Sequence, residues 1–463
     1  MAREKKEGGL NVSVKSFLTA IIVIFVLMVA TYILTFVIPG GAYDRNAAGE
    51  IVKGSFHYID GGIPFFKWIL SPFLVLGAEG SSTIIAVLIF LLVIGGVFNA
   101  VGEHGLMKYM LDKITYKFGE SRYKLMTVIM LFFMAMGALI GSFEECIPLV
   151  PIVVALSLSL GWDRLTGMGM SLLAVGCGFA SGVCNPFTVG VAQTLAGLPM
   201  FSGVWLRAVA FVFIFALLWV FVRGHAKKVE RPIEEKALTD FVKDPKMDKG
   251  LALFGGIIGF GIVVVLFSPF IPALQDYTMV IVAVMFLVAG IVAPLVSGMG
   301  GKTLAGSFGS GVVSMLPAVL MILMASSIKY TLETANVLDT VLNGAVGVAD
   351  TMPKWAVILF IYLIVLVMNF FIGSGSAKAF MLIPLIVPLA AQFGIPAQLC
   401  IMAFAFGDGF SNVLYPTNAA LLISLGLADV GYGTWFKWSI KFQLLNLVLT
   451  SGLLLLGLAV GYC

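Results

Sequence analysis

The tripeptide Ile140-Gly141-Ser142 recurs as Ile372-Gly373-Ser374, an offset of 232 positions in a chain of 463 residues. The first copy opens the stretch Gly141-Ser142-Phe143-Glu144-Glu145-Cys146, and the second opens Gly373-Ser374-Gly375-Ser376-Ala377-Lys378. Further matches follow at nearly the same spacing: Pro151 with Pro384, Gly161 with Gly394, and Gly178-Phe179 with Gly409-Phe410. Because weak identities at a nearly fixed spacing indicate an internal repeat, we predict a chain built from two related halves.

The composition of the chain is that of a membrane protein. Hydrophobic residues make up 60% of it and charged residues only 11%, whereas soluble domains carry about 25% charged residues. The net charge of +4 comes from 28 basic and 24 acidic residues, and the basic residues lie between apolar runs instead of forming one stripe. These features exclude a soluble enzyme, a disordered protein and a nucleic-acid binder. The expected partner is the lipid bilayer, with no nucleic acid.

Apolar runs of about 20 residues, the length that spans a bilayer, recur from end to end. Continuous runs of Leu, Ile, Val and Phe lack the alternation of a β-barrel, so we predict an all-α polytopic membrane protein. The run at 63–79 is shorter and interrupted by Lys67 and Pro72, which leaves open a tilted span or a peripheral helix. The expected helical runs are 17–38, 82–101, 123–140, 144–160, 165–181, 203–222, 250–270, 277–297, 309–328, 354–371, 376–393, 397–411 and 437–460.

A charged segment divides the chain. Residues 223–249 hold 14 of the 52 charged residues, which is typical of a solvated linker between a first half at 1–222 and a second half at 250–463. This linker, the amino terminus and the loop 102–122 are rich in Lys and Arg, so the positive-inside rule places all three in the cytoplasm. That assignment gives nine spans plus two paired segments if 63–79 does not cross the membrane, and about ten if it does.

The two halves are expected to be inverted repeats, because each holds an odd number of full spans. Each contains an apolar pair with a Gly-Ser tip, at 123–160 and 354–393, followed by a broken helix, at 165–197 and 397–427. Inverted repeats with matching helix breaks indicate a secondary transporter whose site lies near the middle of the membrane. The pairs could be re-entrant hairpins or ordinary spans. The repeated small polar tip favours hairpins, because exposed backbone at membrane depth needs a protein-lined cavity.

Two carboxylates mark the first tip. Glu144 and Glu145 follow Gly141 and Ser142 at the start of the second arm, where negative charge is favourable. They could form a solvated turn that caps this arm. Carboxylates at membrane depth, however, usually mark ion pathways, proton relays or countercharges for a cationic substrate. Adjacent helical residues point about 100° apart, so we expect one of the two glutamates to face the site.

The first broken helix carries a second group of candidates, Asn185, Pro186 and Thr188. Pro186 removes a backbone donor and frees an upstream carbonyl group. This carbonyl and the side-chain oxygens of Asn185 and Thr188 could hold a cation or a polar ligand. The alternative is a simple proline kink, and the matching break in the second half favours the site.

The second half brings one base and one acid into the membrane. Lys378 could neutralise a carboxylate, bind a substrate carboxylate or reach an interface. Asp408 lies inside an apolar run whose next turn is broken, which favours a site or coupling role over a structural ion pair. Backbone amides of the tip could hold a carboxylate, as helix amino termini do. The other candidates in this half are Gly373, Ser374, Gly375, Ser376, Asn412, Pro416, Thr417 and Asn418.

No cofactor and no resident metal are expected. The five cysteines lack paired spacing, so they predict neither disulfides nor a zinc site. The chain also lacks a His-Glu-x-x-His motif, and its three histidines fall near loops, which argues against an intramembrane enzyme. The expected coupling ion is Na⁺ or H⁺, and Na⁺ could be held near Asn185 and Asn412.

Three motifs carry a resemblance that covers nearly the whole chain. They are Phe406-Gly407-Asp408-Gly409-Phe410-Ser411-Asn412 with Pro416-Thr417, Gly373-Ser374-Gly375-Ser376 followed by Pro384, and Asn185-Pro186-Phe187-Thr188-Val189-Gly190 with Ala196-Gly197-Leu198-Pro199. In these the chain resembles the YfcC-type members of the anaerobic C4-dicarboxylate carrier family, which also includes arginine/ornithine exchangers. The resemblance implies the architecture of the ion-transporter superfamily, a homodimer, elevator-type alternating access and a multi-pass location in a bacterial cytoplasmic membrane.

Two hypotheses about the substrate follow. A dicarboxylate site should be rich in hydroxyls, amides and a cation, whereas Glu144, Glu145 and Asp408 here outnumber Lys378. The acidic excess favours a carrier of basic amino acids that exchanges arginine-like for ornithine-like ligands. The alternative is proton- or Na⁺-coupled transport of C4-dicarboxylates or other small organic acids, in which the carboxylates carry the coupling ion and Lys378 meets the anion.

Overall fold

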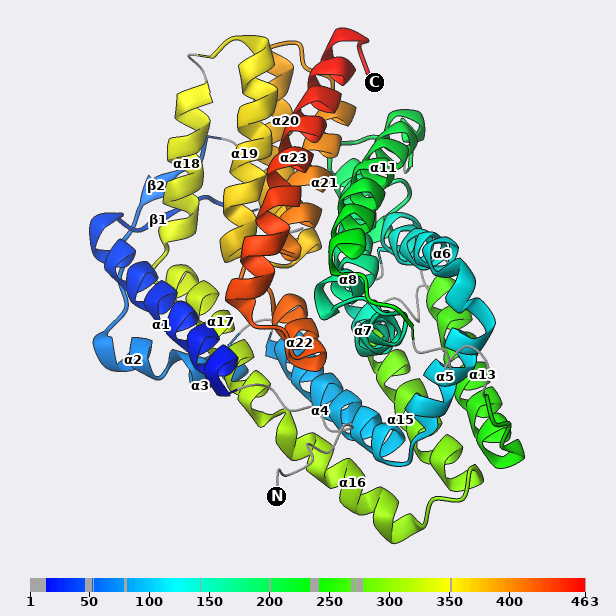
Figure 1. The fold of residues 1–463 in the computed structure, drawn as a ribbon. Helices are drawn as coiled ribbons and strands as arrows, with labels where there is room; N and C mark the ends of the chain where they lie inside the picture. The colour runs from blue at the N-terminus through cyan, green and yellow to red at the C-terminus, as the bar shows by residue number, and fades with distance from the viewer. Residues whose placement is uncertain are drawn as a thin grey trace.

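The computed structural model describes residues 14–45, 52, 54–78, 81–141, 143–199, 201–233, 241–267, 271, 278–349 and 352–462. These residues are almost entirely helical, apart from two short strands, β1 (Gly41–Ala42) and β2 (His57–Tyr58), which pair antiparallel. The predicted all-α class is confirmed (Figure 1). Ser142, one of the predicted tip residues, lies outside the described residues.

The helices of the first half follow the predicted runs closely. They are α1 (Val14–Val37), α2 (Phe65–Ile69), α3 (Ser71–Leu74), α4 (Ser81–Glu103), α5 (Leu106–Phe118), α6 (Arg122–Ala135), α7 (Val150–Ser159), α8 (Arg164–Met168), α9 (Ala174–Ser181), α10 (Val191–Leu195) and α11 (Val204–Val229). Shorter turns join them at Val75–Gly77, Gly119–Ser121 and Glu144–Leu149, and π-helical turns lie at Met136–Ile140, Gly169–Leu173 and Pro186–Gly190.

The helices described in the second half are longer on average. They are α13 (Pro245–Phe267), α15 (Thr278–Val296), α16 (Gly301–Ser314), α17 (Leu316–Thr334), α18 (Val337–Ala349), α19 (Lys354–Phe371), α20 (Gly375–Gln392), α21 (Ala397–Asn412), α22 (Ala419–Ala428) and α23 (Tyr432–Ala459). The two amphipathic helices that precede the apolar pairs, α5 and α18, have 13 residues each. They lie on opposite sides of the molecule in Figure 1.

The segment 63–79 forms short helices instead of one long one. Its helices α2 and α3 have five and four residues, and a further short turn follows at Val75–Gly77. Pro72 lies in the first turn of α3, where a missing backbone donor is tolerated. At 1.5 Å per residue none of these pieces can cross a bilayer, so the peripheral alternative is correct for this segment.

Both broken helices end at residues that cannot continue a helix or that cap one. Helix α9 ends at Ser181, where Gly182 adopts a left-handed φ of +53°, and the chain becomes helical again at Pro186. Helix α21 ends at Asn412, and α22 begins at Ala419 after Asn418, whose side chain accepts a hydrogen bond from the Leu421 amide at 3.1 Å. Such a side-chain acceptor satisfies an amide that would otherwise lack a partner at the start of the helix.

The broken helices α9 and α21 cross each other at a point where only glycine fits. A β-carbon on Gly409 would lie 2.3 Å from the Cα atom of Ala180, which is far inside van der Waals contact. On the other face of α9, a β-carbon on Gly178 would lie 1.9 Å from the carbonyl oxygen of Met134 in α6. These contacts bring the two breaks and the first apolar pair together in the middle of the fold.

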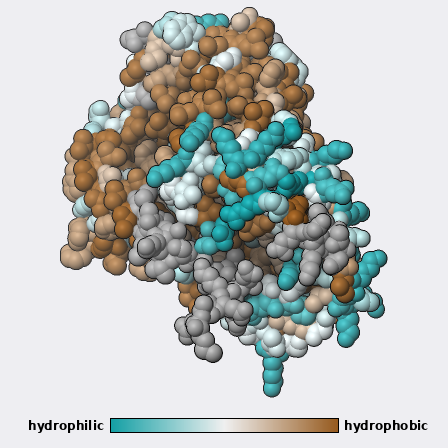
Figure 2. All heavy atoms as spheres, in the orientation of Figure 1, coloured by the Kyte–Doolittle hydropathy of each residue, from teal (hydrophilic) through white to brown (hydrophobic). Residues whose placement is uncertain are grey.

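The outer surface exposes large apolar side chains, as expected for a protein in contact with lipid. Large apolar side chains such as Val448 of α23 and Val212 of α11 are 74% and 62% exposed. Figure 2 shows hydrophobic residues over the top and left of one face, with hydrophilic residues gathered toward its centre and right. Seven apolar helices or consecutive helix pairs in the described part of the chain are long enough to cross a membrane. They include α19 and α20, so the predicted count of spans and hairpins stays a prediction.

Candidate functional site

One cavity gathers most of the predicted site residues. Its volume is about 530 Å³, within the range of roughly 300–1,000 Å³ typical of small-molecule sites. Both tips and both helix breaks border it. The predicted residues along its wall are Gly141, Glu144, Glu145, Thr188, Gly373, Ser374, Gly375, Ser376, Asn412, Thr417 and Asn418.

Asn185 and Pro416 lie at the breaks and are not part of the described cavity wall. Asn185 lies behind the first tip, since a β-carbon on Gly141 would be 2.3 Å from its Oδ1 atom. Pro416 is buried in the second break, between α21 and α22. Pro186 begins the π-helical turn after the first break. The ligand-sized space is therefore bordered by neighbours of Asn185 and Pro416.

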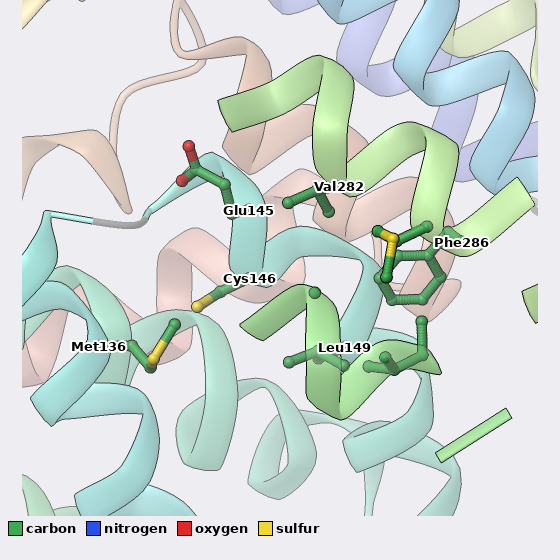
Figure 3. A pocket seen from close by; sticks show the side chains of 9 residues that line it. Met136, Glu145, Cys146, Leu149, Val282 and Phe286 are labelled. Carbon is green, nitrogen blue, oxygen red and sulfur yellow. The ribbon is translucent and has the colours of Figure 1, made fainter. Parts of the chain in front are cut away.

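The two glutamates of the first tip begin the helical turn Glu144–Leu149, and both border the cavity. Glu145 borders a second, much smaller and mostly apolar space of about 20 Å³ as well. In Figure 3, Glu145, Cys146 and Leu149 lie on one side of this space and Val282 and Phe286 of α15 on the other, and the Glu145 carboxylate points away from Val282 and Phe286. Glu145 therefore lies at the junction between the polar cavity and the apolar surface of α13 and α15.

Lys378 and Asp408 form a buried ion pair. The Lys378 Nζ atom lies 2.5 Å from Oδ1 of Asp408, and both side chains are fully buried. Neither residue is part of the described cavity wall. Of the three roles predicted for Lys378, the geometry matches the neutralisation of a carboxylate. Asp408 has an ion-pair partner, because Lys378 reaches it from the neighbouring helix α20, and its predicted site or coupling role stays a prediction.

Asn369 of α19 completes this cluster, and sequence reasoning missed it. Its amide group donates hydrogen bonds to the carbonyl oxygen of Asp408 at 3.1 Å, to Oγ of Ser411 at 2.6 Å and to Oδ1 of Asn412 at 3.0 Å. Its own Oδ1 accepts a hydrogen bond from Lys378. A lone amide inside the apolar run 354–371 was the available signal, because buried polar side chains require partners.

One wall of the cavity comes from α17, which the sequence had indicated only as a span. Lys329 and Glu333 border the cavity here and form an ion pair at 3.3 Å, one helical turn apart. The helical run predicted from the sequence ends at 328, just before these charges, so the sequence does not indicate them as site residues. Ser326 and Tyr330 add a hydroxyl and a phenol to the same wall.

Two helix amino termini border the cavity. Ser374 caps α20 by accepting a hydrogen bond from the Ala377 amide at 3.4 Å, and Asn418 caps α22. The first residues of both helices form part of the wall. Free backbone amides and the helix dipole favour negative charge at such positions. The cavity thus combines carboxylates at one tip with amide donors at the other tip and at the second break.

The described residues contain no cluster of three or more His, Cys, Asp or Glu side chains able to hold a metal. Two buried oxygens near the second tip, Oγ1 of Thr188 and Oδ2 of Asp408, have no hydrogen-bond partner within the described ranges. Both residues contact the same point of the tip. A β-carbon on Gly375 would lie 2.7 Å from Oδ2 of Asp408 and 2.7 Å from Cγ2 of Thr188.

Comparisons with known proteins agree with this picture. The sequence profile described as "DcuC: C4-dicarboxylate anaerobic carrier" matches residues 17–459. The chain is 28% identical to an Escherichia coli K12 protein named "Putative basic amino acid antiporter YfcC", with 96% of each chain covered. It is 24% identical to an uncharacterized protein of Haemophilus influenzae, over 78% of this chain and 73% of that protein.

Two solved structures also align. The Alcanivorax borkumensis YdaH transporter has a TM-score of 0.45 at 17% identity, covering 96% of this chain and 99% of its own. The Neisseria gonorrhoeae protein MtrF, described in the context of antimetabolite efflux pumps, has a TM-score of 0.46 at 16% identity, with 94% of each chain covered. Because the family profile spans nearly the entire sequence, the chain belongs to the C4-dicarboxylate anaerobic carrier family and is a multi-pass membrane transporter, not an enzyme.

Proposed function

We propose that this transporter carries basic amino acids and exchanges arginine-like for ornithine-like substrates. The observation that carries the proposal is the charge around the cavity. Its described wall contains three carboxylates, Glu144, Glu145 and Glu333, but only one ammonium group, that of Lys329. Lys329 already pairs with Glu333, and Lys378 is buried against Asp408. The remaining surplus of negative charge suits a cationic side chain.

The rest of the substrate has matching groups. The α-carboxylate of an amino acid fits the amino termini of α20 and α22, where backbone amides border the cavity. The cationic side chain then reaches Glu144 and Glu145 at the opposite tip. This arrangement distinguishes a basic amino acid from a neutral one, because only the cationic side chain offsets the negative charge of the two partly desolvated carboxylates.

The position of Glu145 supports exchange over uniport. Glu145 borders both the cavity and the apolar space against α13 and α15. In the proposed elevator movement, the unit of hairpins and broken helices slides past these helices, within a homodimer held together by the other spans. The negative charge of the Glu145 carboxylate would then move along an apolar surface, which is costly. A bound cation removes that cost, so the loaded carrier moves and the empty one does not.

A second candidate function is supported by the pair of helix amino termini at one cavity. Two such termini, at α20 and α22, could hold the two carboxylates of a C4-dicarboxylate. The glutamates would then bind protons, or Na⁺ would be held near Asn185 and Asn412, to offset the added negative charge. This function requires that uptake depends on a Na⁺ or pH gradient, whereas exchange of basic amino acids requires neither.

Counterflow in proteoliposomes tests the proposal. Vesicles are loaded with ornithine or with succinate, and the entry of labelled arginine and labelled succinate is followed without an ion gradient. We expect arginine to enter only ornithine-loaded vesicles, and Glu144→Gln and Glu145→Gln to reduce this entry at least about tenfold. The control is Glu120→Gln, which changes an exposed carboxylate outside the cavity. Entry of succinate, or full arginine exchange in both variants, would overturn the proposal.

A further inference from the structure

The ammonium group of Lys378 sits in a shell of oxygen atoms where three helices meet. Its Nζ atom lies 2.5 Å from Oδ1 of Asp408 on α21, and it also donates a hydrogen bond to Oδ1 of Asn369 on α19. Lys378 itself comes from α20, and all three side chains are buried. Carboxylate and amide oxygens are also the ligands that hard metal cations take from proteins.

Asn369 is held in the orientation that this shell requires. Its nitrogen donates hydrogen bonds to Ser411 at 2.6 Å and to Asn412 at 3.0 Å, so its oxygen points to the ammonium group. Asn412 in turn accepts a hydrogen bond from Asn418 at 3.0 Å, and both of these residues border the substrate cavity. A chain of hydrogen bonds therefore runs from the cavity wall to the buried cation.

The cation shell lies directly behind the second tip. A β-carbon on Gly375, which borders the cavity, would lie 2.7 Å from Oδ2 of Asp408. This oxygen is buried and has no hydrogen-bond partner within the described ranges. Gly375 therefore lies between the buried Lys378–Asp408 pair and the cavity proposed for the substrate.

In the first half, the corresponding tip packs against its broken helix without a charge pair. Counted from the matched Ile-Gly-Ser tips, Lys378 corresponds to Cys146 and Asn369 to Gly137, and counted from the matched Gly-Phe pairs, Asp408 corresponds to Cys177. Both cysteines are buried. Gly137 packs directly on the backbone of α9, since a β-carbon there would lie 2.2 Å from the Val175 carbonyl oxygen. Apolar packing is therefore sufficient to hold a tip against a broken helix. The Lys378–Asp408 pair accordingly has another function.

We propose that the Lys378 ammonium group is a tethered cation that permanently fills an ion site in the second half. Because it is covalently attached, it cannot be released to either side, and it adds no ion to the transport stoichiometry. The second half then needs no Na⁺ from solution to hold Asp408 and Asn369 in place beside the substrate. The inference rests on the chain being a transporter and does not require basic amino acid exchange, but it excludes a Na⁺ ion held near Asn412.

Replacement of Lys378 by alanine should create a vacant ion site. In Lys378→Ala, the carboxylate of Asp408 and the oxygen of Asn369 face the space left by the side chain. We expect thermal unfolding of the purified full-length chain to be the same in NaCl and in choline chloride for the wild type and for Lys378→Arg. Lys378→Ala should unfold at a clearly lower temperature in choline chloride and recover in NaCl, because an uncompensated buried carboxylate is strongly destabilising.

Counterflow with the substrate that the wild type exchanges gives a second readout. Lys378→Ala should lose about tenfold or more of its rate in choline chloride and regain most of it in NaCl. A further variant, Lys378→Met combined with Asp408→Asn, removes both charges and should show no response to Na⁺ in unfolding. If this double variant responds as Lys378→Ala does, the ion binds elsewhere and the proposal fails.

Other outcomes also overturn the inference. Equal unfolding of Lys378→Ala in the two salts would show that no ion replaces the lysine. If the variant is recovered folded from neither salt, the ion cannot substitute for the ammonium group, and the tethered-cation role is wrong. Recovery of the folded variant from NaCl alone would support the inference, because it shows that the ion replaces the ammonium group. Since unfolding is measured without substrate, failure of this inference is distinct from failure of basic amino acid exchange.

Discussion

Gly375 lies against Asp408 so closely that a β-carbon at position 375 would be 2.7 Å from Oδ2 of the carboxylate. The same atom would meet Thr188 from the first half, also at 2.7 Å. Gly375→Ala must therefore push the tip away from both breaks, and overpacking of this kind costs about 1–3 kcal/mol. We expect a lower unfolding temperature and a transport rate reduced about tenfold or more.

Gly373 provides the matched control for stability. A β-carbon there would meet nothing within 4 Å, although Gly373 is only two positions away and belongs to the same tip. Gly373→Ala should therefore unfold close to the wild-type temperature. Equal destabilisation by the two alanines would show that the tip is sensitive to any side chain, not to contact with Asp408.

Glu145→Gln should change the kind of transport as well as its rate. The variant no longer carries the negative charge of residue 145 past α13 and α15, so the empty carrier is free to reorient. We expect efflux of preloaded labelled ornithine into substrate-free buffer, which the wild type should not show. The measurement compares this efflux with efflux into buffer containing arginine. A ratio near one for the variant and well above one for the wild type is expected, and strict exchange by both would contradict the role of Glu145.

The pH dependence of stability should report on Asp163, in the loop before α8. Partial burial raises the pKa of this carboxyl, but hydrogen bonds from His225 at 2.9 Å and from Thr166 outweigh burial and hold the pKa below its ordinary value. The carboxylate therefore stabilises the fold fully above the unfolded-state pKa of about 3.9, and this contribution is lost as pH falls through the lower folded-state pKa.

Asp163→Asn should accordingly lower the unfolding temperature at pH 5 and above, with the difference from the wild type shrinking below about pH 4. Unfolding followed by intrinsic tryptophan fluorescence across this range checks the expectation. Glu120→Gln, at an exposed position, serves as the reference for general effects of acid. A difference that persists unchanged at pH 3 would mean that Asp163 acts through packing and not through its charge.

Arg207 and Tyr462 should be energetically coupled. The fully buried guanidinium of Arg207 donates hydrogen bonds to the Ser202 carbonyl at 2.9 Å and to the Tyr462 hydroxyl at 3.4 Å. Tyr462 in turn donates to the Gly203 carbonyl. Arg207→Met leaves buried acceptors without partners, at about 1–3 kcal/mol for each unsatisfied group.

A double-mutant cycle with Arg207→Met and Tyr462→Phe measures this coupling. We expect the combined loss of unfolding free energy to fall short of the sum by about 0.5–3 kcal/mol, as for residues in one hydrogen-bond network. Additive losses would indicate that the carboxy-terminal segment is held by packing alone, for example by the ring contact between Trp205 and Tyr462.

The features that could be read from the sequence are those set locally. Long apolar runs specify helices, and Gly182 and Pro186 mark the first break wherever the helix lies in the fold. The same is true of the two tips, whose glycine and serine residues cannot continue an apolar arm. Eleven of the predicted positions meet at one cavity because they follow these tips and breaks.

What could not be read are the pairings made by tertiary structure. The partner of Lys378 is 30 positions away on another helix, and sequence spacing alone does not indicate which way either side chain points. Asn369 was missed because one amide in an apolar run carries no spacing signal. The contact of Tyr43 with Asp339 of α18, at 3.1 Å from backbone nitrogen to carboxylate, joins residues almost 300 positions apart.

The π-helical turn Gly169–Leu173 lies in an interval in which the two predicted repeats differ in length. The offset between matched glycines falls from 233 at Gly161 and Gly394 to 231 at Gly178 and Gly409, so the first half has two more residues in this interval. The wider turn lies inside this interval and takes up surplus residues within a continuous helix, without a loop. The wider turn leaves the residues on either side of it in helical register, so α9 still presents Gly178 to α6. The rotation of α9 about its own axis, not its length, therefore decides whether the first tip can pack against it.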